Sequence, residues 1–165
     1  MQFRELAGTM ARLESTSSRL RSVRLVAEFL STVPARELPS VVYLLQGQLR
    51  PPYEGVELGV GERILVRSIA RAFGDSETAT SRRLRRVGDL GLVAESMAPR
   101  AKRTRLTVRR AYDDLLAIAH ASGAGSVERR SDLLVALLRR VGPTESRYLV
   151  RIAKLGIGLC LVLLS

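Results

Sequence analysis

The sequence has one cysteine, one histidine and no tryptophan. Because Cys160 is alone, it can form neither an intramolecular disulfide nor a cysteine metal cluster, which fits a reducing cytoplasm. His120 lacks the second histidine that a common zinc site would use, so we interpret it as a helix surface residue. The sequence therefore predicts no metal site.

Long apolar runs are also missing. The N-terminus, MQFRELAG, has no apolar signal core. The apolar stretch from Gly156 to Leu164 has about half the length that a bilayer span requires. We therefore expect no membrane anchor, and we interpret this stretch as a buried end or an abnormal tail.

Acidic residues are scarce, since 27 lysines and arginines stand against 16 acidic residues and give a formal charge of +11. Such a surplus favours a polyanionic partner, either nucleic acid or an anionic membrane surface. Only Lys102 and Lys154 are lysines, and the arginine excess fits either bidentate phosphate contacts or the codon composition of a GC-rich genome. Ten basic and two acidic residues lie between Arg82 and Arg110, where they form either a polyanion contact or a solvated loop.

The length of 165 residues fits one domain with its own core. Apolar residues recur at helical spacing after Ser17 and Ser18, which are candidate N-caps, and Gly74 is expected to end a later helix. The predicted helices cover about 20–33, 36–49, 62–73, 76–87, 107–121, 127–141 and 144–154. Because no alternating strand pattern is present, we predict an all-α, multi-helix single domain.

A weak internal repeat links residues 22–45 with residues 130–150. Each segment has a helix, a proline break at Pro34 or Pro143, and a Tyr-Leu pair. Two similar helical hairpins predict a pseudo-two-fold arrangement, although leucine-rich helices can also match by coincidence. A true duplication would suit a ligand with an approximate two-fold axis, such as duplex DNA.

Glycine is concentrated in three turns, at 50–62, 87–91 and 122–126. In the first, Pro51 and Pro52 stop one helix, and three glycines precede the next. A helix N-terminus exposes backbone N–H groups that bind phosphate, and glycine allows a close approach. The arginines beside all three turns favour phosphate contact, and the alternative is that each turn is only a helix cap.

Two kinds of enzyme site are not supported. A phosphate-binding loop of the G-x-x-x-x-G-K-[ST] type needs a lysine, whereas Gly61 is followed by Glu62 and Arg63, and no apolar strand precedes it. The Asp113-Asp114 pair is most simply the solvated face of an amphipathic helix. We therefore predict neither nucleotide binding nor hydrolysis from these residues.

Five segments together resemble a known family. They are ELAGTMARLESTSSRLRSVRLVAEFL (5–30), ELPSVVYLLQGQLRPPYEGVELGVGE (37–62), GDLGLVAES (88–96), LTVRRAYDDLLAIAHASGAGSVERRSDLLVALL (106–138) and PTESRYLVRIA (143–153). The chain closely resembles the N-terminal DNA-binding domain of ATP-dependent DNA ligases of the archaeal and eukaryotic type. The resemblance extends to about Ala153.

This resemblance implies an all-helical, pseudo-symmetric domain that binds the minor groove on both sides of a nick by shape and backbone. It implies roles in DNA replication, repair and recombination, in a prokaryotic cytoplasm and associated with the nucleoid, with double-stranded, preferentially nicked DNA as partner and no membrane. The DNA-facing positions that it implies are Gly88, Asp89, Leu90 and Gly91, then Gly123, Gly125 and Ser126, with Arg129 and Arg130 reaching phosphates. Arg147 and Arg151 match arginine-bearing positions of the family, and they either contact DNA or pair with Glu145 or with the DNA-binding loops. The first turn, by this comparison, is mainly a structural connector.

The sequence departs from the family near its end. Leu155-Gly156-Ile157-Gly158 has glycine where the family has arginine, and no K-x-D-G motif occurs, so the lysine that would take AMP is absent. We therefore expect residues 1–153 to form the DNA-binding domain and residues 154–165 to be an apolar tail, either aberrant or a truncated linker. The chain is not expected to ligate DNA alone or to bind a cofactor, since ATP and Mg²⁺ are implied only for a full-length ligase.

Three functions stay open at this point. In the first, the chain is the DNA-binding module of a ligase. The catalytic region of that ligase is then cut off, replaced through a frameshift or supplied by a second chain. In the second, the chain is a stand-alone, non-catalytic DNA-binding protein. A third interpretation is a helical protein that uses the Arg82–Arg110 segment at a membrane surface.

Overall fold

The computed structural model describes residues 1–58, 60–100 and 105–155. Over these residues it holds nine α-helices, two 3₁₀ helices and no strand, with one isolated bridge between Gln2 and Thr107. The helices are α1 (Phe3–Glu14), α2 (Arg19–Thr32), η1 (Ala35–Glu37), α3 (Leu38–Gln46), η2 (Pro52–Glu54), α4 (Glu62–Phe73), α5 (Glu77–Val87), α6 (Leu90–Met97), α7 (Val108–His120), α8 (Ser126–Leu138) and α9 (Pro143–Leu155). The all-α prediction is confirmed.

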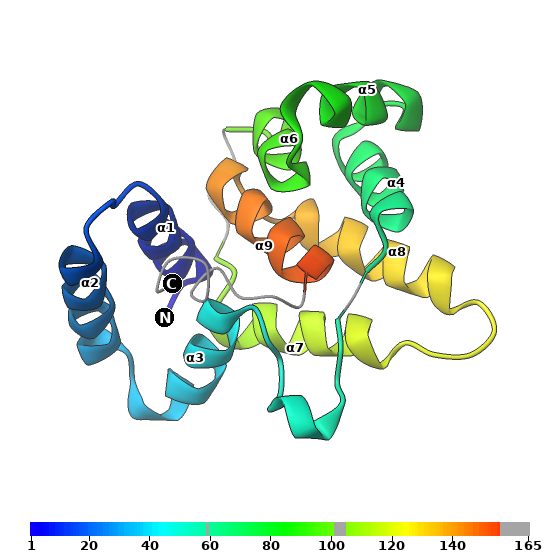
Figure 1. The fold of residues 1–165 in the computed structure, drawn as a ribbon. Coiled ribbons are helices and arrows are strands. Elements are labelled where there is room, and N and C mark those ends of the chain that lie inside the picture. The colour runs from blue at the N-terminus through cyan, green and yellow to red at the C-terminus, as the bar shows by residue number, and fades with distance from the viewer. Residues whose placement is uncertain (59, 101–104, 156–165) are drawn as a thin grey trace.

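Helix α9 lies at the centre of the fold (Figure 1). It packs against α1, α4 and α6, while α7 packs against α3 and α8, and α5 against α4 and α6. Helix α2 lies at the edge beside α1. Because α9 contacts several helices, its residues Tyr148, Leu149 and Val150 are almost completely buried.

Most helix ends follow local capping rules. Ser18 is the N-cap of α2, and its side chain accepts a hydrogen bond from the backbone N–H of Arg21 at 3.4 Å. Gly74 ends α4 in the left-handed conformation, with φ 73°. Both were predicted.

Helices α1 and α6 were not predicted from the sequence. Helix α1 contains Gly8 and Thr9, which are poor helix formers, but one face of it is buried in the core. Helix α6 is two turns long and begins directly after Asp89, so its first turn was assigned to the preceding glycine turn. In both cases tertiary packing, not local propensity, stabilises the helix.

The segment at 50–62 is tied to the rest of the fold. The backbone N–H of Val60 donates to the carbonyl of Ala153 in α9 at 2.9 Å, and the Tyr112 hydroxyl of α7 donates to the carbonyl of Leu49 just before the segment. Leu58 and Val60 are buried, whereas Tyr53 is 87% exposed. These contacts agree with a structural connector between α3 and α4.

The two repeat segments both fold as a helix, a proline turn and a second helix. Residues 22–45 cover most of α2, η1 and α3, and residues 130–150 cover parts of α8 and α9. Their surroundings differ, because α9 is central and α2 is at the edge. The pseudo-two-fold relation stays a prediction.

No helix in the described ranges is both long enough and apolar enough to cross a membrane. The apolar stretch Gly156–Leu164 and Cys160 lie outside the described residues, as do Gly59, Lys102 and Arg103. The predicted tail at 154–165 is likewise outside them, apart from Lys154 and Leu155, which belong to α9.

Candidate nucleic-acid interface

The first predicted turn joins α5 to α6. Gly88 ends α5 in the left-handed conformation (φ 79°) and is exposed. Asp89 is the N-cap of α6, and its carboxylate accepts a hydrogen bond from the backbone N–H of Leu92 at 2.9 Å. Leu90, only 1% exposed, and Gly91 are buried in the first helical turn. Gly88 and Asp89 are thus the solvent-facing half of this turn.

Gly91 is a point of close helix packing. A Cβ atom at this position would lie 2.8 Å from the carbonyl oxygen of Arg147, 2.8 Å from Cγ of Arg151 and 2.9 Å from a carboxylate oxygen of Asp89. Such distances are shorter than carbon and oxygen atoms tolerate without movement. Glycine therefore lets α6 lie directly against α9.

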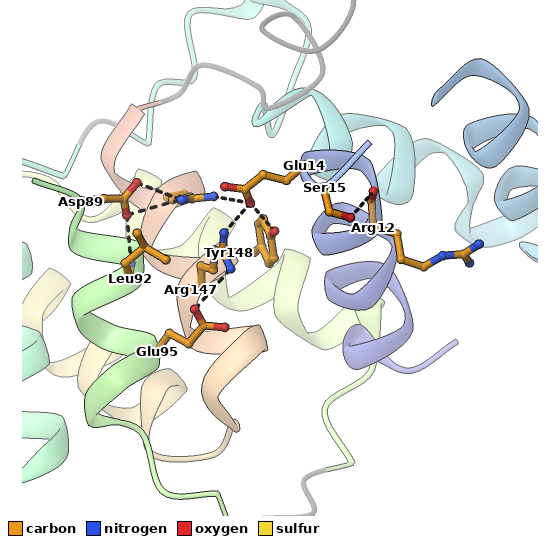
Figure 2. Close-up of polar contacts among 9 residues, drawn as sticks. Arg12, Glu14, Ser15, Asp89, Leu92, Glu95, Arg147 and Tyr148 are labelled. Carbon is orange, nitrogen blue, oxygen red and sulfur yellow. Dashed lines mark hydrogen bonds and ion pairs between the residues drawn. The ribbon is translucent and has the colours of Figure 1, made fainter. Parts of the chain in front are cut away.

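An ion-pair network surrounds this contact (Figure 2). The Arg151 guanidinium donates to Asp89 at 2.9 Å and to Glu14 at 2.8 Å. Arg147 contacts Glu14 at 2.7 Å and donates to Glu95 at 3.2 Å. The Tyr148 hydroxyl also donates to Glu14, at 2.6 Å. Two arginines of α9 thus connect α1, the α5–α6 turn and α6.

Both guanidinium groups are largely removed from solvent. The side chains of Arg147 and Arg151 are 18% and 15% exposed, and their guanidinium carbons lie 5.4 and 5.6 Å from the centroid of the Tyr148 ring. This arrangement adds cation–π attraction to the ion pairs. Because each arginine already pairs with two carboxylates, a DNA phosphate would have to compete for it.

The structure shows the intramolecular partners of these two arginines. Glu145 accepts a hydrogen bond from the backbone N–H of Gly142 at 2.7 Å, as a cap of its own helix. Arg151 pairs with Asp89 of the turn, which is the loop-pairing alternative. Glu14 and Glu95 were missed, because nothing in local spacing connects them to α9. Whether Arg147 and Arg151 also touch DNA stays a prediction.

The network changes the protonation of its members. Burial alone would raise the pKa of Glu14, but hydrogen bonds from Arg151, Tyr148 and Arg147 outweigh it and lower the pKa to about 2. Burial acts on Asp89 in the same direction, and the bonds from Arg151 and the Leu92 N–H lower its pKa overall. Burial and the Glu14 hydrogen bond raise the pKa of Tyr148. The carboxylates of Glu14 and Asp89 are therefore ionised near neutral pH.

These shifts predict acid sensitivity. A carboxyl group whose pKa is lowered by folding stabilises the protein above its unfolded-state pKa, and this stability is lost as the pH falls through the folded-state value. For Glu14 the window runs from 4.5, its ordinary value, down to about 2. Urea unfolding at a series of pH values should show Glu14→Gln less stable than wild type at neutral pH, with the difference shrinking across this window. A difference independent of pH would contradict the assignment.

The second predicted turn joins α7 to α8. Gly123 and Gly125 both adopt the left-handed conformation, with φ 77° and 76°, and both are exposed. Gly125 is the N-cap of α8 and Ser126 its first residue, with no side-chain cap. His120, as expected, is exposed at the end of α7. The backbone of this turn is thus open to a ligand.

The charged side chains at the start of α8 differ in their pairing. Glu128 is engaged by Arg67 of α4 through two hydrogen bonds of 2.7 and 2.9 Å. Arg130 donates to the carbonyl of Ala121 at 3.0 Å and is half-buried. Arg129 is exposed and has no side-chain hydrogen bond or ion pair with any residue that the structure describes. Arg129 is thus the arginine of this turn that is open to a phosphate.

The two turns lie apart in the molecule, one between α5 and α6 and the other between α7 and α8 (Figure 1). The predicted residues therefore do not converge on one pocket. Within the described ranges, no group of three or more histidine, cysteine or acidic side chains could hold a metal ion. Asp113 and Asp114 pair with Arg109 and Arg110 of the same helix, α7.

Comparison with known proteins shows the family of the chain. Residues 2–159 match the family described as DNA ligase N terminus. The chain is 36% identical to a DNA ligase of Pyrobaculum islandicum over 96% of its own length and 29% of that protein. It is 40% identical to a DNA ligase 2 of Thermofilum pendens, over 88% of its own length and 26% of the relative. It thus spans less than a third of the length of these relatives. The chain belongs to the DNA ligase N terminus family.

Proposed function

We propose that this chain binds duplex DNA without reading its base sequence, as the DNA-binding module of an ATP-dependent DNA ligase. It lies in the minor groove and along the backbone on both sides of a nick. The observation that carries this proposal is the α7–α8 turn, where two exposed left-handed glycines precede a helix N-terminus beside Arg129, which is unpaired among the described residues. Such a turn offers backbone N–H groups and a guanidinium to phosphate.

The separation of the two turns supports an extended ligand. A small anion would need converging groups, whereas a duplex can reach both the α5–α6 and the α7–α8 turn. The +11 charge of the chain favours the same partner. Backbone N–H groups at a glycine turn carry no base specificity, so binding follows backbone and shape.

The remaining parts of the reaction belong to another region. ATP, Mg²⁺ and the lysine that takes AMP act in a catalytic region, either of a longer chain or of a second one. The whole protein acts in DNA replication, repair and recombination, and it works at the nucleoid in a prokaryotic cytoplasm.

Titration of nicked and intact duplexes at several salt concentrations tests this proposal. We expect dissociation constants on the order of micromolar that rise steeply with salt, because phosphate-bound counterions are released. Arg129→Ala should flatten the slope of log K against log salt by about one unit. Arg109→Ala, which removes an exposed arginine already paired with Asp113, is the matched control and should change the slope less.

Two results would count against the proposal. Absence of binding to either duplex at low salt would refute the DNA-binding function. If Arg129→Ala had the same slope of log K against log salt as wild type, Arg129 would not contact phosphate, but the DNA-binding function would not be refuted.

A further inference from the structure

Helix α5 carries a surface made of arginine. Arg82, Arg83, Arg85 and Arg86 are all exposed, and Thr80 is the only fully buried residue of the helix. Arg82, Arg85 and Arg86 are spaced at i, i+3 and i+4, so they lie on one side of α5. These three residues are called the α5 arginine face below.

The charges of this face are not compensated within the described part of the chain. The two acidic residues that precede the face, Asp75 and Glu77, are used elsewhere, since Asp75 lies 3.6 Å from Arg83 and Glu77 lies 3.9 Å from Arg67. No side chain of the face makes a hydrogen bond or an ion pair with any other described residue. Like charges at these spacings repel one another in a helix, so pairing within α5 does not explain the face.

The face leads directly into the α5–α6 turn. Arg85 and Arg86 are in the last turn of α5, which ends at Gly88. The next residue, Asp89, would oppose a phosphate, but its carboxylate is paired with Arg151 at 2.9 Å. The positive field of the face is therefore not cancelled at the turn.

We propose that the α5 arginine face binds the phosphate backbone of duplex DNA beyond the contacts made by the two glycine turns, and so lengthens the stretch of duplex that is covered. This inference rests on the proposed function. Arg82 and Arg86 are about 6 Å apart along the helix axis, a span that reaches neighbouring phosphates of one strand. Guanidinium groups bind phosphate oxygens in a bidentate manner and carry no base specificity there.

An anionic membrane fits this helix less well. A helix that lies on a membrane needs a broad apolar side next to its basic side. In α5 the exposed large apolar residue is Val87, while the buried Thr80 and the half-buried Ala79 and Leu84 face the protein. The chemistry of the face thus matches a phosphate backbone and not a lipid bilayer.

The test compares two triple variants that remove the same charge. The first is Arg82→Gln, Arg85→Gln and Arg86→Gln. The second is Arg19→Gln, Arg21→Gln and Arg24→Gln on α2. These three arginines are also exposed and have no side-chain partners among the described residues. Helix α2 lies on the other side of the molecule from α5 in Figure 1. Both are titrated with a short and a long nicked duplex over a range of salt, and circular dichroism checks that both stay folded.

We expect the α5 variant to flatten the slope of log K against log salt by roughly two to three units, because each phosphate contact contributes about 0.9. It should also lose the gain in affinity that wild type shows on the longer duplex. The α2 variant should change the slope by less than about one unit and keep that gain.

Equal effects of the two variants would overturn the inference, since long-range charge would then explain the binding. No effect of the α5 variant would also overturn it, because the α5 arginine face would then contact no phosphate. Loss of binding to equimolar phosphatidylcholine–phosphatidylserine vesicles in the α5 variant, with DNA binding unchanged, would also overturn it. Wild-type binding to nicked duplex reports separately on the proposed function, so the two failures are distinguishable.

Discussion

Replacing Arg151 with methionine should lower the free energy of unfolding by about 2–4 kcal/mol, because the change leaves partly buried carboxylates without their counter-charge. Arg151 is 15% exposed and pairs with Asp89 and Glu14 at 2.9 and 2.8 Å. Methionine keeps the apolar stem of the side chain and removes only the guanidinium. Urea unfolding at neutral pH measures the loss.

A double-mutant cycle separates the ion pair from general packing. Asp89→Asn removes the charge and keeps an N-cap residue for α6. The double variant should therefore lose less stability than the sum of the two single variants. Arg109→Met, on an exposed arginine that is 69% accessible, should cost less than about 1 kcal/mol. Strict additivity in the cycle would show that Arg151 and Asp89 do not interact in solution.

Gly91→Ala should also destabilise the protein, by about 1–3 kcal/mol, because the new methyl group would lie within 3 Å of the Arg147 carbonyl and of the Arg151 side chain. The backbone carbonyl cannot rotate away, so α6 would have to move off α9. This cost opposes the preference of helices for alanine over glycine, which is about 1 kcal/mol. The shift of the urea midpoint gives the net result.

Gly8 and Gly88 are matched controls. Gly8 lies in α1, and no neighbouring side chain or helix among the described residues comes within 4 Å of an added methyl group, so Gly8→Ala should be neutral or stabilising by up to about 1 kcal/mol. Gly88 has equally open space but a φ of 79°, so Gly88→Ala should cost about 1–2 kcal/mol through backbone strain alone. If Gly91→Ala changed the free energy of unfolding as little as Gly8→Ala, α6 would not pack closely on α9 in solution.

The network and the glycine contact have a shared consequence for the proposed DNA interface. They attach the α5–α6 turn to the helices α9 and α1, and Gly88 and the end of the α5 arginine face lie next to this attachment. Arg151 is in this sense a positioning residue, because it acts on the turn through Asp89. The α7–α8 turn is held separately, through Arg130 and the Arg67–Glu128 pair.

The sequence predicted the helices whose signals are local. Helix α4 was expected over 62–73 and has these bounds, because its apolar spacing and its Gly74 cap are contained in one segment. Helices α5, α7 and α9 agree within one residue at each end, while α8 begins one residue before and ends three residues before its expected limits. Helices α1 and α6 were missed, since their stability comes from burial against α9.

The features of the candidate site also fall into those that the sequence predicted and those that it did not. The glycine turns at 87–91 and 122–126, the arginine surplus and the similarity to a ligase DNA-binding domain could all be recognised from residue type and order. The partners of Arg147 and Arg151 could not. Arg151 and Glu14 are 137 positions apart, and no spacing rule connects residues at that distance in a chain.

The sequence alone therefore determined the fold class, the positions of most helices, the places of the glycine turns and the family, because these depend on periodicity, capping and residue order within short segments. Only the tertiary structure decided which charges are neutralised inside the protein and which remain outside it. Arg151 and Arg129 look alike as residues of basic helices, yet one is paired against Asp89 and Glu14 and the other is open to solvent. The difference arises because ion pairing depends on distances of a few ångströms between helices, which the packing of α1, α6 and α9 sets.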